Sequence, residues 1–263
     1  MPSRCGPIAA RAAGAKAASI TSQAGRFPED PLLILAIDTT TRAGSTAVID
    51  DGRVIVEITG DAAITHGQRL PGDIGRTLAA AHVELSQIAL LAVVAGPGSF
   101  TGLRIGIASI QGLAFARALK IVPVSALEAI AGIAGRAGGG GRRVAAWVDA
   151  HRGEVYSCLF GGSPLRELTP PASASPEATL HAWRDLLGQA PVVFAGDGAV
   201  RYREAIGAQA GGAEILDPPP PLAGEAGRIA AAHPERAVAP NAIVPIYVRR
   251  PDVELARERT AGR

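Results

Sequence analysis

Near the start of the chain stands the stretch Leu32-Leu33-Ile34-Leu35-Ala36-Ile37-Asp38-Thr39-Thr40. Its apolar run has the length of a buried strand and is far too short to cross a membrane. The run ends at a carboxylate followed by hydroxyl side chains, and further strand patterns follow at residues 45–49 and 54–59. Together these features predict a three-stranded meander with Asp38 at the end of its first strand.

A second copy of this plan follows the glycine run Gly138–Gly141, where the strand pattern Val144–Val148 ends at Asp149 and a return strand is expected at Val155–Phe160. Helical patterns cover residues 66–85, 101–119, 125–133, 175–187 and 224–232, strand patterns cover 88–95, 121–124 and 192–195, and a turn is expected at 196–198. Two such halves in tandem predict an α/β fold of the duplicated ribonuclease-H-like, or actin-like ATPase (ASKHA), type. Its two lobes are expected at residues 32–137 and 138–263.

The charge of the chain is unevenly placed. The 263 residues include 26 Lys and Arg against 24 Asp and Glu, but residues 1–28 carry four basic residues and no acidic one. The remainder is therefore slightly acidic, and aromatic residues are scarce at 4%. This composition argues against a surface that binds nucleic acid unaided. Residues 1–31 are expected to be a disordered or wrongly assigned extension, with a targeting segment as the alternative.

The polar residues that follow the first strand of each half are candidates for chemistry. In folds of this class, Asp38, Thr39, Thr40 and Asp149 would lie where a nucleotide phosphate and Mg²⁺ can be held. An ordinary turn, in which each carboxylate accepts local backbone N–H groups, explains the same residues. Both interpretations stay open at this point.

The segment Gly96-Pro97-Gly98-Ser99-Phe100-Thr101-Gly102 resembles a phosphate loop but lacks the Lys and Ser/Thr ending of a Walker motif. Pro97 also removes one backbone donor. An elbow from strand to helix, with Ser99 or Thr101 as the N-cap, is favoured.

Small residues recur along the helix expected after this elbow. They fall at helical spacing and leave one face almost without side chains: Gly102, Gly106, Ser109, Gly112 and Ala116. Glycine in a helix costs about 1 kcal/mol relative to alanine, so a close approach of another backbone should offset it. That neighbour is either another part of the chain or a helix of another subunit. The helix near residue 70 has a similar pair, Gly72 and Gly75.

Several enzyme classes find no support in the residue pattern. The five histidines are scattered, without the spacing of a zinc site, and the two cysteines, Cys5 and Cys158, form no metal motif or disulfide framework. No Gly-x-Ser-x-Gly elbow of a serine hydrolase occurs.

Four segments in order along residues 32–255 closely resemble the TsaB family, formerly YeaZ. They are Leu35–Thr40, Ala95–Gly106, Val148–Tyr156 and Pro245–Arg249, and the long glycine-rich motif of the second is highly specific. The resemblance implies a non-catalytic scaffold subunit that supports a TsaD-like catalytic subunit in forming N6-threonylcarbamoyladenosine next to the tRNA anticodon. A TsaE-like ATPase would join the assembly, and tRNA would bind only through the complex.

The resemblance also implies which residues matter. The partner interface would lie on the helices near 66–83 and 101–118 and include His66, Leu70, Ile74, Gly102, Gly106, Ser109 and Gly112. Asp38, Thr39, Thr40 and Asp149 would be a vestigial nucleotide site, without catalytic or metal-binding residues. This chain alone would need no cofactor, because ATP with Mg²⁺ and a metal belong to the partner subunits. A cytoplasmic protein without membrane contact is expected, and a homodimer in isolation is left open. The alternative function is a stand-alone actin-like ATPase or small-molecule kinase.

Overall fold

The computed structural model describes residues 32–137, 141–188 and 190–249. The expected extension at 1–31 and most of the glycine run at 138–141 lie outside the described residues. The described residues contain no helix that is both long enough and apolar enough to span a membrane.

The first sheet contains the expected meander. Its strands are β1 (Leu33–Asp38), β2 (Ser45–Asp50), β3 (Arg53–Thr59), β4 (Leu90–Gly96) and β5 (Ile121–Ser125), in the order β3-β2-β1-β4-β5. β1 runs antiparallel to β2 and parallel to β4. Every residue of β1 is buried, which explains its continuous apolar run, because a central strand covered on both faces has no side for water.

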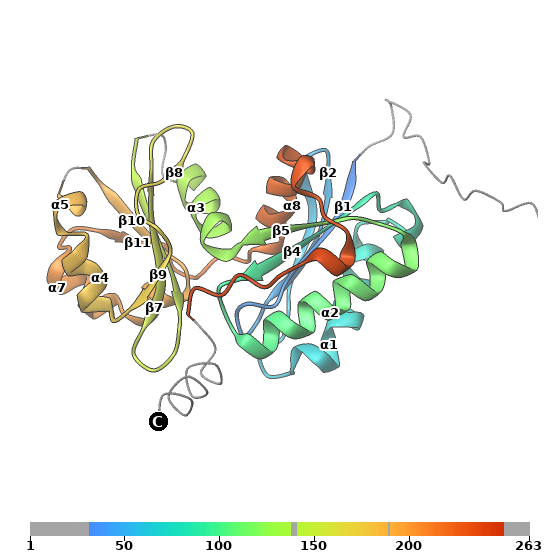
Figure 1. The fold of residues 1–263 in the computed structure, drawn as a ribbon, viewed down its shortest axis with the longest axis horizontal. Coiled ribbons are helices and arrows are strands. Elements are labelled where there is room, and N and C mark those ends of the chain that lie inside the picture. The colour runs from blue at the N-terminus through green and yellow to red at the C-terminus, as the bar shows by residue number, and fades with distance from the viewer. Residues whose placement is uncertain (1–31, 138–140, 189, 250–263) are drawn as a thin grey trace, which may run out of the picture. The chain divides into compact units, whose positions relative to one another are not determined.

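Helices cover both faces of this sheet (Figure 1). α1 (His66–Ala80) and α2 (Phe100–Arg117) pack on one face, where Leu35 and Ile37 join a common apolar cluster with side chains of both helices. The alternate residues Ile34 and Ala36 point to the opposite face, where they join residues of α3 (Ala126–Ala137) and α8 (Ala223–Ala232). The two-residue period of a strand thus divides the core into two layers. A short 3-10 helix, η1 (Leu85–Gln87), follows α1.

The second sheet repeats the first. Its strands are β6 (Arg143–Asp149), β7 (Val155–Gly161), β8 (Arg166–Glu167), β9 (Ala172–Ala174), β10 (Val192–Ala195) and β11 (Glu214–Ile215). The order β11-β10-β6-β7-β8 mirrors that of the first sheet, with β9 added beside β7. β6 is antiparallel to β7 and parallel to β10, as β1 is to β2 and β4. The predicted duplicated α/β fold is confirmed.

The second half departs from the predicted elements at several places, and its short strands β8, β9 and β11 were not predicted. The helix expected over 175–187 is divided into α4 (Pro176–Ala182) and α5 (Arg184–Leu187) at Trp183, whose backbone leaves helical geometry while its ring packs 6.3 Å from that of Trp147. The turn expected at 196–198 occupies only Gly196, with a φ of 105°, and α6 (Asp197–Arg201) begins directly after it. α7 (Arg203–Gln209) was not predicted.

Helix α8 lies late in the chain but packs on the first sheet, against β1 and β2. Side chains of the first sheet accept hydrogen bonds from its first backbone N–H groups: Ser45 Oγ from Ala223 at 3.0 Å and Glu57 Oε1 from Gly224 at 2.8 Å. The residue at the N-cap of α8 makes no side-chain hydrogen bond, so these two acceptors take the place of an N-cap side chain. Arg136 of α3 adds an ion pair with the buried Glu225.

Replacing Gly227 with alanine tests the fit of α8 on the sheet. A Cβ at Gly227 would overlap the side chain of Ile49, so Gly227→Ala should destabilise the protein by roughly 1–3 kcal/mol. Gly207 of α7 is the matched control, because a Cβ there would meet no described atom within 4 Å. Gly207→Ala should stabilise by up to about 1 kcal/mol through helix propensity. Urea unfolding measures both, and equal effects of the two substitutions would contradict this packing.

Candidate functional site

The turn after β1 is held by the carboxylate of Asp38, of which only 2% is exposed. The backbone N–H and the hydroxyl of Thr40 donate hydrogen bonds to Asp38 Oδ1 at 2.8 and 2.6 Å. This is the local turn expected as the alternative to a phosphate site. One carboxylate oxygen of Asp38 and the hydroxyl proton of Thr40 are thus engaged with each other.

The same turn is bonded to the start of α2. The Thr39 hydroxyl donates to the backbone oxygen of Gly102 at 2.8 Å, and the Ser99 N–H donates to the Thr40 carbonyl at 2.8 Å. Ser99 Oγ accepts from the Gly102 N–H at 3.2 Å, so Ser99 is the N-cap of α2. The predicted elbow is confirmed in this respect, and it joins β4 to α2 while holding the β1 turn.

Glycine is required where this turn meets the helix. A Cβ at Gly98 would lie 2.6 Å from Thr40 Cβ, and Cβ atoms at Gly102 and Gly106 would collide with Thr39. Two of the small residues expected to receive a partner helix therefore face the interior of the chain. The close approach that offsets their helix cost is made by the β1 turn.

Asp149 occupies the equivalent place at the end of β6. Its Oδ1 accepts from the His151 N–H at 3.0 Å, and its Oδ2 lies 3.4 Å from Arg201 Nη1. The Asp149 N–H in turn donates to Asp197 Oδ1 at 3.0 Å. The expected counterpart of Asp38 is thus a second local turn, with an arginine as its ion-pair partner.

A cleft of about 590 Å³ lies between these two strand ends. It is lined from the first half by Thr40, Thr41, Arg42, Ala62, Ala63, Ile64, Thr65, His66, Ser99, Thr101, Gly102 and Ile105, and from the second by Asp149, His151, Asp197 and Arg201. Of the four residues expected at a nucleotide site, the structure brings Thr40 and Asp149 to this cleft, whereas Asp38 and Thr39 are not among the residues that line it. A wall with several hydroxyl side chains thus faces a wall with two aspartates, a histidine and an arginine.

Burial shifts the pKa of Asp197 and His66, which line this cleft, and of Asp38, which is hydrogen-bonded to the lining residue Thr40. It raises the pKa of Asp38 to about 6, and the carboxylates of Asp197 and Glu57 add to the effect. It also raises the pKa of Asp197, with the charge of Asp149 contributing. Burial lowers the pKa of His66, whose Nε2 donates to the Thr41 carbonyl at 2.9 Å and whose Nδ1 faces Arg69 Nη2 at 2.9 Å. These two contacts hold the His66 ring against the turn after β1.

Two residues expected at the partner interface belong to the core instead. Leu70 is 1% and Ile74 8% exposed, and both pack in the cluster beneath α1 and α2. Their spacing on α1 marks the buried face of an amphipathic helix, which one sequence cannot distinguish from an interface. Gly112 does face outward, where a Cβ would meet no described atom within 4 Å, and Ser109 is half-buried.

Most of the residues on the exposed surface of α1 and α2 are not those that were expected at the partner interface. We call this surface the outer helix face. It comprises Gly67, Pro71, Gly72, Gly75 and Ala79 of α1 and Arg104, Ala108, Gly112, Phe115 and Ala116 of α2. Phe115 is 64% exposed, unusual for so large an apolar side chain. The only sign of its exposure in the sequence was its helical spacing from Arg104, Ala108 and Gly112.

A buried ion pair inside α1 was also missed. Arg69 pairs with Asp73, and their side chains are only 6% and 1% exposed. Arg69 further donates to the backbone oxygen of Ala43, in the loop between β1 and β2. The spacing of four residues allows an Arg–Asp pair on a helix, but it gives no sign that the pair is buried.

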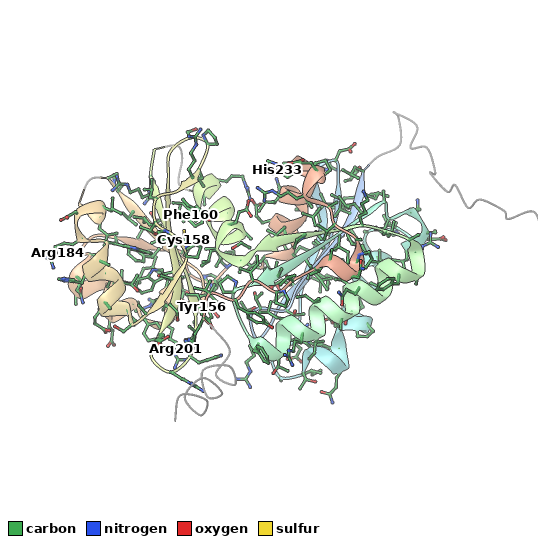
Figure 2. All side chains as sticks on the ribbon, viewed as in Figure 1. Tyr156, Cys158, Phe160, Arg184, Arg201 and His233 are labelled. Atoms are coloured by element: carbon green, nitrogen blue, oxygen red, sulfur yellow. The ribbon has the colours of Figure 1, made fainter. Side chains whose placement is uncertain are left out.

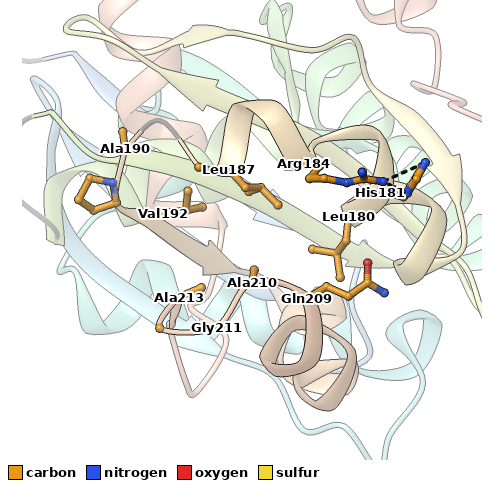
Figure 3. A pocket seen from close by; sticks show the side chains of 13 residues that line it. Leu180, His181, Arg184, Leu187, Ala190, Val192, Gln209, Ala210, Gly211 and Ala213 are labelled. Carbon is orange, nitrogen blue, oxygen red and sulfur yellow. Dashed lines mark hydrogen bonds between the residues drawn. The ribbon is translucent and has the colours of Figure 1, made fainter.

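The second hollow offers less for chemistry. It measures about 520 Å³ and lies beside α4, α5 and the segment after α7 (Figure 3). Most of its lining residues are exposed, and its polar edge is formed by Arg184 and His181, which hydrogen-bond to each other. Among the described residues, no group of three His, Cys, Asp or Glu side chains is placed to hold a metal ion.

Comparison with known proteins gives consistent similarities. Residues 58–215 match the family model described as TsaD, tRNA N6-adenosine threonylcarbamoyltransferase. The chain is 43% identical over 123 residues to the tRNA threonylcarbamoyladenosine biosynthesis protein TsaB of Escherichia coli, covering 47% of this chain and 52% of that protein. The chain therefore spans about half the length of this curated relative.

Solved structures match over a longer range. A protein of Pseudomonas aeruginosa described as uncharacterized, with similarity to peptidase YeaZ, is 32% identical with a TM-score of 0.71. A structure described as YeaZ from the same organism is 32% identical with a TM-score of 0.68. Both matches cover 82% of this chain and 99% of the solved chain.

The raised pKa of Asp38 makes stability depend on pH. The folded state holds this proton more tightly than the unfolded chain does. The group's contribution is therefore most favourable below about pH 4, falls as the pH rises to about 6 and stays constant above it. Asp38→Asn keeps the oxygen that accepts from Thr40 and removes the buried charge. We expect no stability difference from the parent at pH 4 and a gain of about 1–3 kcal/mol at pH 7.

Urea unfolding of both proteins from pH 4 to pH 7 measures this difference. Because the other titrating groups are shared, they cancel in the comparison. A difference that stays constant over this range, or one that favours the parent at pH 7, would show that Asp38 is ionised at no cost in the folded protein.

Proposed function

Because the chain belongs to the TsaB (YeaZ) family, we propose that it is a non-catalytic scaffold subunit in the formation of threonylcarbamoyladenosine in tRNA. A TsaD-like subunit would carry out the transfer, and a TsaE-like ATPase would join the assembly. ATP with Mg²⁺ and a metal ion would be held by these partners, and tRNA would bind only to the complex. The assembly would work in the cytoplasm.

The observation that carries this proposal is the outer helix face. α1 and α2 pack against each other and leave small residues of both helices open to solvent, with Arg76, Arg104 and Phe115 among the larger exposed side chains. Small residues let two helix backbones approach closely, and a large exposed aromatic such as Phe115 is typical of an interface anchor. A pair of helices from a TsaD-like subunit could pack on this face. Without that partner, the same face would suit a second copy of the chain.

The state of the strand-end residues supports the non-catalytic part of the proposal. The hydroxyls of Thr39 and Thr40 donate to Gly102 and Asp38, and Asp38 is almost fully buried. Asp149 is engaged by the His151 N–H and by Arg201. A nucleotide site at Asp38, Thr39, Thr40 and Asp149 would need these contacts to be exchanged, so we propose that it is vestigial.

The outer helix face can be tested at Gly112. Gly112→Leu places a branched side chain where the described chain has open space, so the lone subunit should keep its stability or gain up to about 1 kcal/mol. A partner helix packed there would be obstructed. Binding to the TsaD-like subunit of the same organism should weaken at least tenfold, equivalent to roughly 1.4 kcal/mol. Thermal melts of the lone subunit and calorimetric titration of the pair measure the two effects.

Two other glycines serve as controls. Gly207→Leu adds the same side chain to α7, where there is also open space, and should leave binding unchanged. Gly106→Leu should instead destabilise the lone subunit, because its Cβ would collide with Thr39. The proposed interface would be wrong if Gly112→Leu and Gly207→Leu bound the partner equally well.

A further inference from the structure

The segment Val238–Arg249 near the end of the described chain is anchored along the first half of the molecule (Figure 1). Val238 exchanges two backbone hydrogen bonds with Ile121 of the edge strand β5, at 2.9 and 3.0 Å. After the 3-10 helices η2 (Pro234–Arg236) and η3 (Pro240–Ala242), Ile243 is buried in the cluster beneath α1 and α2. The Ile246 N–H then donates to the carbonyl of Ala95 in β4 at 2.8 Å.

Arg249 ends this segment in the second half. Its Nη2 donates to the Ala150 carbonyl at 3.1 Å and lies 2.7 Å from Glu154 Oε2. The guanidinium also lies 5.7 Å from the ring centre of Tyr156, which Figure 2 labels. Glu154 is held in turn by the Ser173 hydroxyl at 2.8 Å. Arg249 thus contacts the turn after β6 and the strand β7 together.

The two anchor points adjoin opposite walls of the cleft. Ala95 directly precedes the elbow that carries Ser99, and Ala150 directly follows Asp149. Ile246 and Arg249 are three residues apart, a distance that extended chain spans in at most about 10 Å. We propose that residues 246–249 form a strap that limits the opening of the cleft, with Arg249 as its latch. This proposal concerns the chain alone and does not depend on the proposed function.

The contacts at the two ends differ in strength, and this difference places the release point at Arg249. The first end is held by backbone hydrogen bonds and by the buried Ile243. At the other end the ion pair is partly open to water, with Arg249 22% and Glu154 38% exposed. Water competes for such a pair, so it can break while both halves stay folded. Once it breaks, the Asp149 wall could move away from the Ser99 wall.

The strap can be tested by measuring the distance between the two halves in the full chain. Spin labels on Ala108→Cys of α2 and Ala208→Cys of α7 report that distance, since both positions are exposed. Cys5→Ser removes one native thiol, and Cys158 is shielded because burial raises its pKa to about 12. Double electron–electron resonance should give a narrow distribution for this labelled parent. Arg249→Gln should broaden it and shift it by several ångströms.

Arg236→Gln is the matched control, because it breaks a similar ion pair with Glu128 at 2.8 Å that does not involve the strap. It should leave the distance distribution unchanged. Glu154→Gln removes the ion pair but leaves the hydrogen bond from Arg249 to the Ala150 carbonyl, so it should broaden the distribution in the same way but less, which guards against a folding defect of one variant. If both latch variants keep the narrow distribution of the parent, the strap does not limit the cleft and the proposal is overturned.

Discussion

The contact on which the rest of the structure depends is the docking of the β1 turn onto the start of α2. Thr39 donates to the backbone oxygen of Gly102, and Thr40 accepts from Ser99 through its carbonyl. These bonds require the turn and the helix to approach closely, which only glycine at 98, 102 and 106 allows. The contact fixes the start of α2, and with it the direction in which the remaining residues of that helix point.

Two consequences for function follow from this docking. The Asp38 carboxylate and the Thr40 hydroxyl are hydrogen-bonded to each other, and these are two of the groups that a site for a nucleotide phosphate and Mg²⁺ would use. With one side of α2 committed to Thr39 and the sheet, the opposite side, with Ala108, Gly112 and Phe115, is left to solvent. The contact of α2 with Thr39 and the exposure of the outer helix face therefore both follow from the way α2 is placed.

The sequence predicted the strands well because their signals are local. Continuous apolar runs such as Leu32–Ile37 can only be buried, and a carboxylate at the strand end marks the turn. The repeat of strand, Asp and turn at Asp149 predicted β6 and β7 of the second sheet, whereas the short strands β8, β9 and β11 were not predicted. Trp183 could not be foreseen as a helix break, because it is set by the contact of its ring with Trp147, far away in the sequence.

The candidate site was predicted only in part. Spacing revealed small residues on α2, but it could not tell that Gly102 and Gly106 face Thr39 while Gly112 faces solvent. Leu70 and Ile74 were assigned to an interface although they belong to the core, since an apolar helix stripe has the same pattern in both cases. The strap at Arg249 depends on contacts with residues about 100 positions earlier, which no local pattern records.

The most direct test of this account is hydroxyl-radical footprinting of the chain, alone and bound to the TsaD-like subunit of its organism. Phe115 is a sensitive probe, because its ring is reactive and 64% exposed. The account predicts strong protection of Phe115 and Pro71 in the complex. Leu168, 42% exposed and on the second half, should react equally in both states. A bound complex in which Phe115 stays fully reactive would contradict the central claim that the outer helix face receives the partner.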